Sequence, residues 1–175
     1  MILNNSINAG NFIYCAAHIG PGENTGPYLN TGNGHHHQWS YVVSGSAHVW
    51  FSETPDGPAV YSNNSKVPGT LFDHRPYKDL YHHIKTTDDH LSFINFNPIP
   101  DTRNLSISML IGPQTDHVIT AKEQRITIVC ITGPIVANDK ELTAMQHAKL
   151  FPGKTATLTL TENSVCALVT EESDN

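Results

Sequence analysis

Three consecutive histidines, His35, His36 and His37, stand directly before Gln38 and a strand-like apolar run, and they have the clearest capacity for chemistry in this sequence. Neutral imidazole is the most common side-chain ligand of transition metals in proteins. Residues i and i+2 of a strand point to the same side, so His35 and His37 can direct two imidazoles at one point. We therefore expect a site for a divalent metal or a small polar molecule.

A further ligand has to come from another strand, and the run Tyr81-His82-His83-Ile84 supplies one. His74 lies in the preceding segment and is another candidate, placed at the mouth of the site. The alternative interpretation is that the three histidines are an exposed accident. Their position at the start of an apolar strand, with a second histidine pair in a later strand, argues against it. The histidines at 18, 48, 90, 117 and 147 are scattered, and we expect solvated or core roles for them.

The elements that position these residues are expected to be strands. Only 15% of the residues are charged, and short apolar runs alternate with turn residues along the whole chain, which indicates an all-β sandwich or barrel. Ser44-Gly45-Ser46 is expected to be a tight hairpin turn. The segment 140–148 has apolar residues at helical spacing, but it fits a β-connection equally well. The expected strands are Ile13–Ala17, Tyr41–Val43, Ala47–Ser52, Val60-Tyr61, Gly69–Phe72, Tyr81–Lys85, Leu91–Phe96, Ser106–Ile111, His117–Thr120, Arg125–Ile131, Ile135-Val136, Ala156–Leu160 and Val165–Val169.

The prolines of Asn97-Pro98-Ile99-Pro100 mark the best internal boundary. We expect a first lobe over residues 1–98, which carries the histidine cluster, and a second β-rich lobe over residues 99–175. Turn residues recur in both halves, which suggests a duplicated β-unit; the alternative is that unrelated hairpins have similar turns. The second half has no His-x-His and is expected to lack a metal site.

Composition excludes several classes of function. The formal net charge is −6 and no cluster of Lys or Arg occurs, so a nucleic-acid partner is not expected. No apolar run is long enough for a transmembrane helix, and the first residues do not look like a secretory signal. The three cysteines are widely spaced, and Cys130 and Cys166 lie in apolar runs, which predicts buried, reduced thiols and a cytoplasmic location.

Two segments together resemble the motifs of the cupin superfamily. The run from Gly34 to Gly45 is similar to the first motif, in which a glycine and His-x-His precede an apolar strand that ends in glycine. Pro68-Gly69 and the run Tyr81–Thr86, with the later Asn97-Pro98, are similar to the second motif. The resemblance implies an antiparallel β-barrel, or jelly roll, and a homodimer, and the second β-rich half makes a compact two-lobed, bicupin-like member one form to expect. It also implies the metal ligands His35, His37, Gln38 and His82.

The sequence departs from this pattern at positions that affect the chemistry. Gln38 stands where the family has a glutamate ligand, so the site lacks one negative charge. The first motif is also shorter than usual, which leaves open whether His35 and His37, or His36 with Gln38, face inward. His82 is preferred to His83 because Ile84 and Thr86 then take the family's apolar and Asn positions. The insert Phe72–Leu80 is longer than usual and contains His74.

Three functions follow from the resemblance. The first is a metal-dependent oxygenase, isomerase or lyase that uses Fe, Mn, Ni or Zn and acts on a small polar molecule. The second is a metal-free isomerase or epimerase of sugar nucleotides, with a histidine as base and a tyrosine as acid. The third is a module that binds a small ligand without catalysis. The fold alone does not choose among them.

Overall fold

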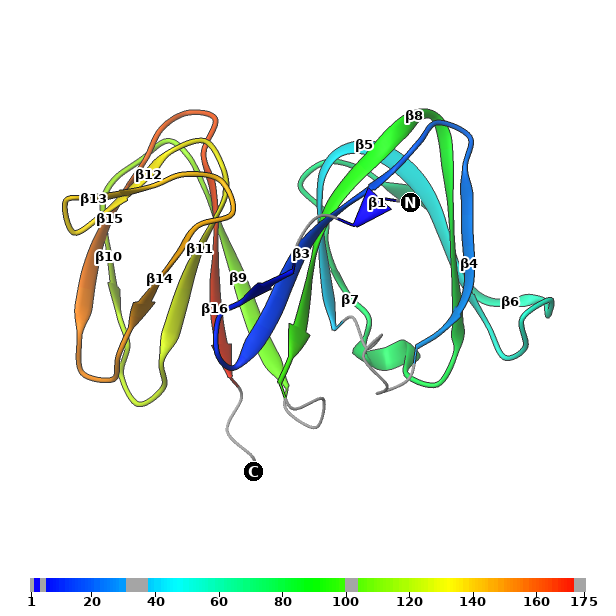
Figure 1. Cartoon of the computed structure of the whole chain (residues 1–175), viewed down its shortest axis with the longest axis horizontal. Helices are drawn as coiled ribbons and strands as arrows, with labels where there is room; N and C mark the ends of the chain where they lie inside the picture. Colours follow the sequence, from blue (N-terminus) through cyan, green and yellow to red (C-terminus); the bar gives the residue numbers. More distant parts are fainter. Residues whose placement is uncertain (1, 4–5, 31–37, 100–103, 172–175) are drawn as a thin grey trace. The chain divides into compact units, whose positions relative to one another are not determined.

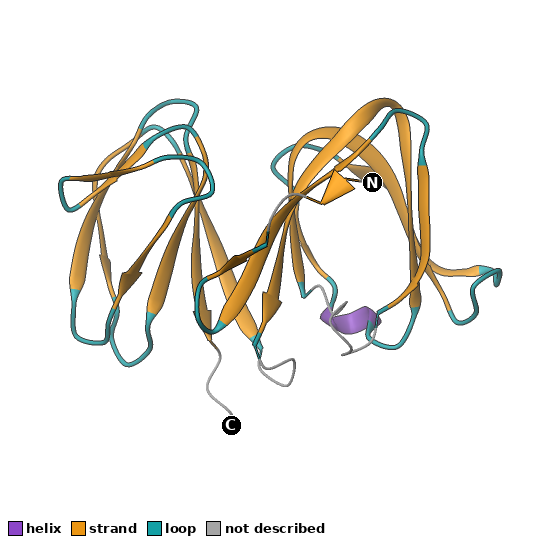
Figure 2. Ribbon diagram, in the orientation of Figure 1, coloured by secondary structure: helices purple, strands orange, loops and turns teal. Residues whose placement is uncertain are grey.

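The computed structural model describes residues 2–3, 6–30, 38–99 and 104–171 of the chain. The chain divides into two compact units, an N-terminal lobe of residues 1–102 and a C-terminal lobe of residues 103–175. Both lobes are built from antiparallel strands, as Figure 1 shows. Within the described residues the single helical element is the short 3-10 turn η1 (Arg75–Tyr77), drawn in purple in Figure 2. The predicted all-β fold is therefore confirmed.

The N-terminal lobe is one curled eight-stranded sheet, with strands in the order β1-β3-β8-β5-β6. In addition, β2 pairs with β3, β4 with β8 and β7 with β5, and every pairing is antiparallel. The bounds are β1 (Ile2–Leu3), β2 (Ile7–Asn8), β3 (Phe12–Ile19), β4 (Asn24–Leu29), β5 (Trp39–Ser52), β6 (Ala59–Lys66), β7 (Leu71–Asp73) and β8 (Tyr81–Pro98).

The two longest strands, β5 and β8, run through positions where the sequence predicted interruptions. Ser44-Gly45-Ser46 is not a hairpin turn but the irregular middle of β5, with shifts of register on both sides. Between the pairs Gly45–Leu91 and Ala47–Thr86, β5 contributes Ser46 and β8 contributes residues 87–90, so β8 bulges. The predicted strands 81–85 and 91–96 are likewise two parts of β8. Glycine is required here because Gly45 has a φ of 78°, and a Cβ would lie 1.5 Å from the carbonyl oxygen of His90.

This bulge explains how one strand keeps an apolar inner face over its whole length. Side chains alternate along a strand, so Ile84 and Leu91 would point to opposite sides of a regular strand. Both belong to the same buried cluster, because the extra residues of β8 reset the alternation. The cluster also includes Val49 and Phe51 of β5 and Phe93 of β8, which line the inside of the curled sheet.

The C-terminal lobe consists of two four-stranded sheets, with strand orders β10-β15-β12-β13 and β14-β11-β16-β9. The segment 140–148 consists of β13, a turn and the start of β14, and it contains no helix, so the β-connection is the correct alternative. The bounds are β9 (Leu105–Ile111), β10 (Gln114–Thr120), β11 (Ile126–Thr132), β12 (Ile135–Ala137), β13 (Lys140–Leu142), β14 (His147–Leu150), β15 (Thr155–Leu160) and β16 (Val165–Glu171).

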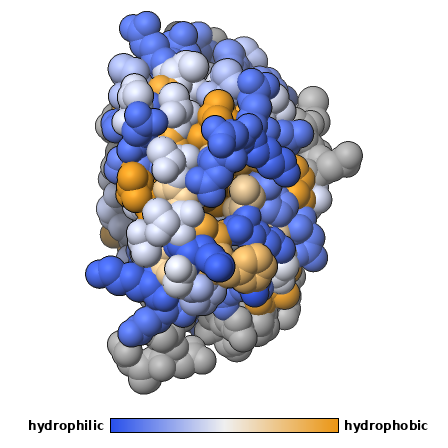
Figure 3. Space-filling model, turned by 90° about the vertical axis from the view of Figure 1, so that its left-hand side faces the viewer, coloured by the Kyte–Doolittle hydropathy of each residue, from blue (hydrophilic) through white to orange (hydrophobic). Residues whose placement is uncertain are grey.

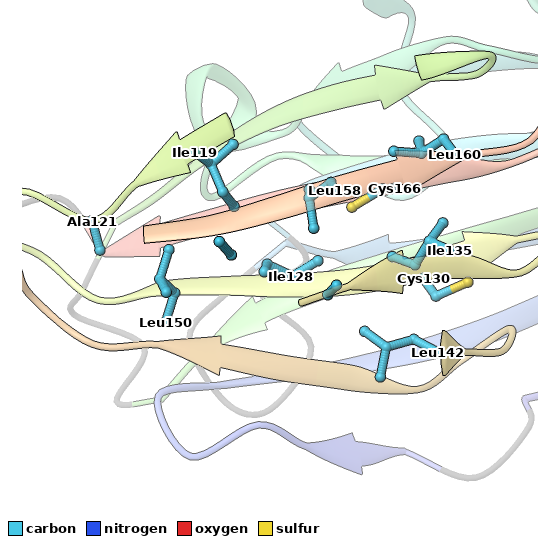
Figure 4. Packing of buried hydrophobic residues seen from close by; sticks show 12 residues of the cluster. Ile119, Ala121, Ile128, Cys130, Ile135, Leu142, Leu150, Leu158, Leu160 and Cys166 are labelled. Carbon is cyan, nitrogen blue, oxygen red and sulfur yellow. The ribbon is translucent and has the colours of Figure 1, made fainter. Parts of the chain in front are cut away.

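The core of the C-terminal lobe is aliphatic and closely packed, as Figure 4 shows. Leu158 and Ile135 are completely buried, and Cys130 and Cys166 pack among them as neighbours on β11 and β16. Both cysteines are free thiols, as the sequence predicted. Burial raises the pKa of Cys130 to about 11 and that of Cys166 to about 12, so both side chains are protonated, unreactive core residues.

Hydrophilic side chains predominate on the face of the molecule drawn in Figure 3, with hydrophobic ones scattered between them. Such a distribution is usual for the surface of a folded domain. Among the described residues there is no helix that is long and apolar enough to cross a membrane.

Candidate functional site

The candidate site lies inside the N-terminal lobe, on the inner face of β5 and β8. Ser40 and Val42 occupy alternate positions at the start of β5 and share this face with Phe93 and Asn95 of β8, and Gln38 directly precedes the strand. A small cavity of about 30 Å³ lies here. It is lined by Ser40, Val42, Val49, Phe72, His74, Ile84, Leu91 and Phe93. Polar residues are thus concentrated at one end of an otherwise apolar interior.

His74 precedes η1 and is buried inside the lobe, with only 5% of its surface exposed. The backbone N–H of His74 donates to the carbonyl of Gln38 at 2.8 Å, which joins the insert to the start of β5. Asn30 donates from Nδ2 to the carbonyl oxygens of His74 and Tyr77, at 3.4 and 3.3 Å. Arg75 makes a bidentate salt bridge to Asp73. These bonds hold the insert in a defined position, and His74 with it.

His82 comes from β8 and shares the strand face of Ile84, which lines the cavity. It is 6% exposed, and its ring centroid lies 6.1 Å from that of His74. Both imidazoles lie 6.2 Å from the ring of Phe51. The fold thus brings the two buried imidazoles of the insert and of β8 together, and Gln38, whose carbonyl bonds to the backbone of His74, is itself only 1% exposed.

Hydrogen bonds around Ser40 determine which ring nitrogen of the neutral His74 carries the proton. Ser40 donates its hydroxyl proton to Oδ1 of Asn95, and Nε2 of His74 lies 2.8 Å from the same hydroxyl oxygen. A hydroxyl has one proton to donate, so Ser40 accepts a hydrogen bond from the Nε2–H of His74. In the neutral imidazole the lone pair is then on Nδ1. Histidines that bind metals characteristically donate their other ring N–H to a fixed partner in this way.

Aromatic rings form one wall beside the two histidines. Tyr77 stacks on Phe51 with 4.3 Å between ring centroids, and Tyr61 lies 4.6 Å from Tyr77. Burial, followed by the hydrogen bond and proximity to Tyr61 and the charge of Asp73, raises the pKa of Tyr77 above its usual value. Tyr77 is therefore a protonated phenol at neutral pH.

His83 lies on the opposite face of β8 from His82. Its ring stacks on Trp50 with 4.7 Å between centroids, and its Nε2 lies 3.0 Å from the hydroxyl of Ser52. Burial lowers the pKa of His83, which favours the neutral ring. Its contacts are those of a packed structural residue on the outer side of the strand. His48 is on the same side, beside Trp50, and is bonded to Ser62 at 2.7 Å.

Of the four ligands expected from the sequence, Gln38 and His82 are buried in the interior of the N-terminal lobe. His35 and His37, and the alternative His36, lie outside the described residues. Residues missed as parts of the site are Ser40, Asn95 and Asn30, and His74 was placed at the mouth although it lies inside. The sequence contained a signal for Ser40 and Asn95. Each is a polar residue two positions from an apolar core residue of its own strand, which places its side chain on the inner face.

Imidazole is a donor that transition metals accept, and two buried imidazoles lie side by side here, with their ring centroids 6.1 Å apart. Across residues 2–3, 6–30, 38–99 and 104–171, however, no three His, Cys, Asp or Glu side chains form a group able to hold a metal ion. A complete ligand set therefore needs an amide or hydroxyl side chain, such as that of Gln38, or a residue outside these ranges. Gln is a weaker ligand than Glu because its amide oxygen carries no net charge.

No protein-family model matches the chain, and no curated protein sequence matches it. Solved structures do resemble it. HutD from Pseudomonas fluorescens SBW25 aligns with a TM-score of 0.60 and 9% identity over 93% of this chain and 80% of its own. YhaK from Escherichia coli aligns with a TM-score of 0.58 and 14% identity, over 92% of this chain and 86% of its own. A mutant of the oxalate decarboxylase OxdC from Bacillus subtilis aligns with a TM-score of 0.61 and 9% identity, over 95% of this chain and 70% of its own.

These similarities extend over most of the chain but are far too low in sequence identity to transfer an activity. Together with the curled antiparallel sheets, they establish the fold. The chain has the cupin-type jelly-roll fold that its two motifs predicted.

Proposed function

We propose that the N-terminal lobe binds a divalent transition metal through His82 and His74, with Gln38 and the histidines at positions 35 and 37 as further ligands, and acts there on a small polar molecule. The observation that carries the proposal is the pair of buried imidazoles of His74 and His82, whose ring centroids lie 6.1 Å apart in the interior of the lobe. Buried histidines are usually either hydrogen-bonded core residues or ligands, and two that lie side by side in one interior favour the second role.

The donor set suits Fe(II), Mn(II), Ni(II) or Zn(II), which accept imidazole together with oxygen ligands. A bound metal would supply Lewis-acid polarisation of a substrate oxygen. The residues of the chain would orient the ligands. Ser40 and Asn95 would fix the ring of His74, while Asn30 and the Asp73–Arg75 pair would fix the insert that carries it.

Metal analysis of protein purified without a His-tag is the direct test. We expect about one equivalent of a transition metal in the N-terminal lobe. His82→Ala and His74→Ala should each lower the metal affinity at least about tenfold, because each change removes one ligand. His48→Ala is the matched control, since His48 lies on the outer side of β5 with Ser62.

The proposal is wrong if the double variant His74→Ala and His82→Ala, folded as judged by its thermal transition, keeps the metal content of the unaltered protein.

The metal-free alternative, an isomerase or epimerase of sugar nucleotides, has one supporting observation. Tyr77 is a protonated phenol that stacks on Phe51, the ring next to both histidines. A cavity of about 30 Å³ is small for such a substrate. Thermal stabilisation by a nucleotide sugar, without any metal, would favour it.

A further inference from the structure

Cys130 of β11 and Cys166 of β16 lie directly opposite each other on neighbouring antiparallel strands of the C-terminal lobe. The side chains of two residues paired in this way point to the same face of the sheet. Both side chains belong to the same buried cluster, and Figure 4 shows them among its aliphatic residues. Neither thiol takes part in the proposed function, which belongs to the N-terminal lobe.

The backbone bonds of Cys130 show which kind of antiparallel pair the two cysteines form. Its N–H donates to the carbonyl of Gln146 at 2.9 Å, and its carbonyl accepts from the N–H of Met145 at 2.8 Å. Both backbone groups are therefore used on the side of β14, which flanks β11 opposite to β16. Cys130 and Cys166 thus form a non-hydrogen-bonded pair, in which the Cα atoms are about 4.5 Å apart and the side chains approach most closely.

This separation is compatible with a disulfide bond, which needs Cα atoms about 4.4–6.8 Å apart. The present bonds of the two thiols are weak ones to backbone carbonyls. Sγ of Cys130 donates to the carbonyl of Gly133 at 2.9 Å, and Sγ of Cys166 donates to that of Ala167 at 3.7 Å. Because a thiol is a weak donor, little is lost when rotation about χ1 turns each sulfur toward the other.

We infer that Cys130 and Cys166 are a site of oxidative modification, at which an intramolecular disulfide forms and links β11 to β16. The inference is independent of the proposed function. The oxidant is a low-molecular-weight disulfide, for which oxidised glutathione serves as the probe. The bond would close a loop that contains β12, β13, β14 and β15, and it would constrain the unfolded chain accordingly.

The reaction is a double thiol–disulfide exchange. One cysteine thiolate attacks glutathione disulfide, which breaks its S–S bond, forms a mixed disulfide and releases one glutathione thiolate. The second cysteine thiolate then attacks the protein sulfur of that mixed disulfide and releases the other glutathione thiolate. Two cysteine thiols are oxidised, one glutathione disulfide is reduced, and the two protons lost by the cysteines pass to the two glutathione thiolates.

The closed core prevents this reaction, so the bond can form only while the core is open. Both cysteines are 0% exposed. Burial raises the pKa of both thiols, and the proximity of Cys130 adds to the effect at Cys166, so the reactive thiolate is scarce. Exchange therefore takes place during folding or during opening of the C-terminal lobe. Once formed, the disulfide would stabilise the lobe against opening again.

The experiment is refolding of the denatured full-length protein in a buffer of reduced and oxidised glutathione, followed by alkylation and peptide mass spectrometry. We expect a single disulfide between Cys130 and Cys166 in most molecules, with Cys15 alkylated. The melting temperature of this form should exceed that of the reduced protein by at least about 5 °C. Cys15→Ala should retain this difference, and Cys166→Ala should abolish it.

The folded protein gives a second measurement. In the same buffer it should form the bond at least about tenfold faster in sub-denaturing urea than without urea, because exchange requires opening. A disulfide that involves Cys15, a stable mixed disulfide with glutathione on Cys130 or Cys166, or complete alkylation of all three cysteines would overturn the inference. A disulfide form that melts no higher than the reduced protein would show that the paired strands do not accept the bond.

Discussion

At the scale of single residues, the interior of the N-terminal lobe depends on a short chain of hydrogen bonds. Nε2–H of His74 donates to Ser40, and Ser40 donates to Asn95. All three residues lie on the inner side of the sheet, where an unpaired polar group would be costly. The same bonds that satisfy Ser40 also decide which nitrogen of neutral His74 keeps its lone pair.

Ser40→Ala should therefore weaken metal binding without removing a ligand. The change deletes the acceptor that holds the His74 ring, and loss of such a partner typically reduces metal affinity by about 10–100-fold. Titration with Ni²⁺ or Zn²⁺ under the conditions used for His82→Ala measures it. Ser40→Thr retains a hydroxyl acceptor and should restore most of the affinity. If Ser40→Ala binds metal as the unaltered protein does, the ring of His74 is not positioned for coordination.

The chemistry of position 38 depends both on the residue type, glutamine, and on its burial. Its amide nitrogen and oxygen distinguish it from a glutamate by one charge and almost no volume, and its burial at 1% exposure makes that charge matter. The identity of this residue is visible in the sequence. Its burial is a property of the folded lobe.

At the scale of elements, the bulge in β5 and β8 allows each long strand to keep an apolar inner side. Gly45 has a left-handed backbone, with φ of 78°, and passes close to the backbone of His90. The cross-strand bond between Ser46 and Thr87, at 2.9 Å, closes the irregular region. These strands position His82 and Gln38, so the bulge also determines where the site residues point.

Gly45→Ala should destabilise the protein by more than about 3 kcal/mol. The alanine would have to adopt a positive φ, which is strained for a residue with a side chain, and its Cβ would collide with the carbonyl of His90. Gly69→Ala is a matched control. Gly69 also has a positive φ, of 88°, but a Cβ there meets nothing within 4 Å. Its cost should be only about 1–2 kcal/mol. Denaturant unfolding of the two variants measures the difference, and equal costs would show that the close approach to His90 is unimportant.

At the scale of the whole molecule, the chain has two cores of different character. The cluster of the N-terminal lobe contains Phe51 and Phe93 and is extended by Phe72 and Tyr77, whereas that of the C-terminal lobe is aliphatic with two cysteines. All the residues of the proposed site belong to the first lobe. We keep the prediction that the C-terminal lobe, which has no His-x-His, serves in packing or in a homodimer.

Leu158→Ala should lower the free energy of unfolding by about 2–5 kcal/mol while leaving the metal affinity of the folded protein unchanged. Leu158 is fully buried in the core of the C-terminal lobe, and shortening a buried leucine leaves a cavity. Val118→Ala, at a 61% exposed position of β10, is the control and should change stability by only about 0.5 kcal/mol. A loss of metal affinity in folded Leu158→Ala would show that the site depends on the second core.

The sequence predicted much of the molecule because strand patterns are local. Alternating apolar residues, turn residues and low charge were sufficient for the all-β fold, and apolar flanks predicted the burial of Cys130 and Cys166. The prediction of a hairpin at Ser44-Gly45-Ser46 was wrong for a physical reason. A glycine between two serines fits a turn or a bulge equally well, and only pairing with the distant β8 selects the bulge.

By itself the sequence determined the chemical character of the site: many imidazoles, a Gln at the position where the cupin motif that it resembles has Glu, and no acidic residue in the histidine segment. Only the tertiary structure decided that His74 lies inside with His82, since an insert between strands has no periodicity that fixes its direction. Its position comes from bonds to Asn30, Gln38 and Ser40, which are distant in the chain. Side-chain types are set residue by residue, but their meeting point depends on long-range pairing that only the folded chain supplies.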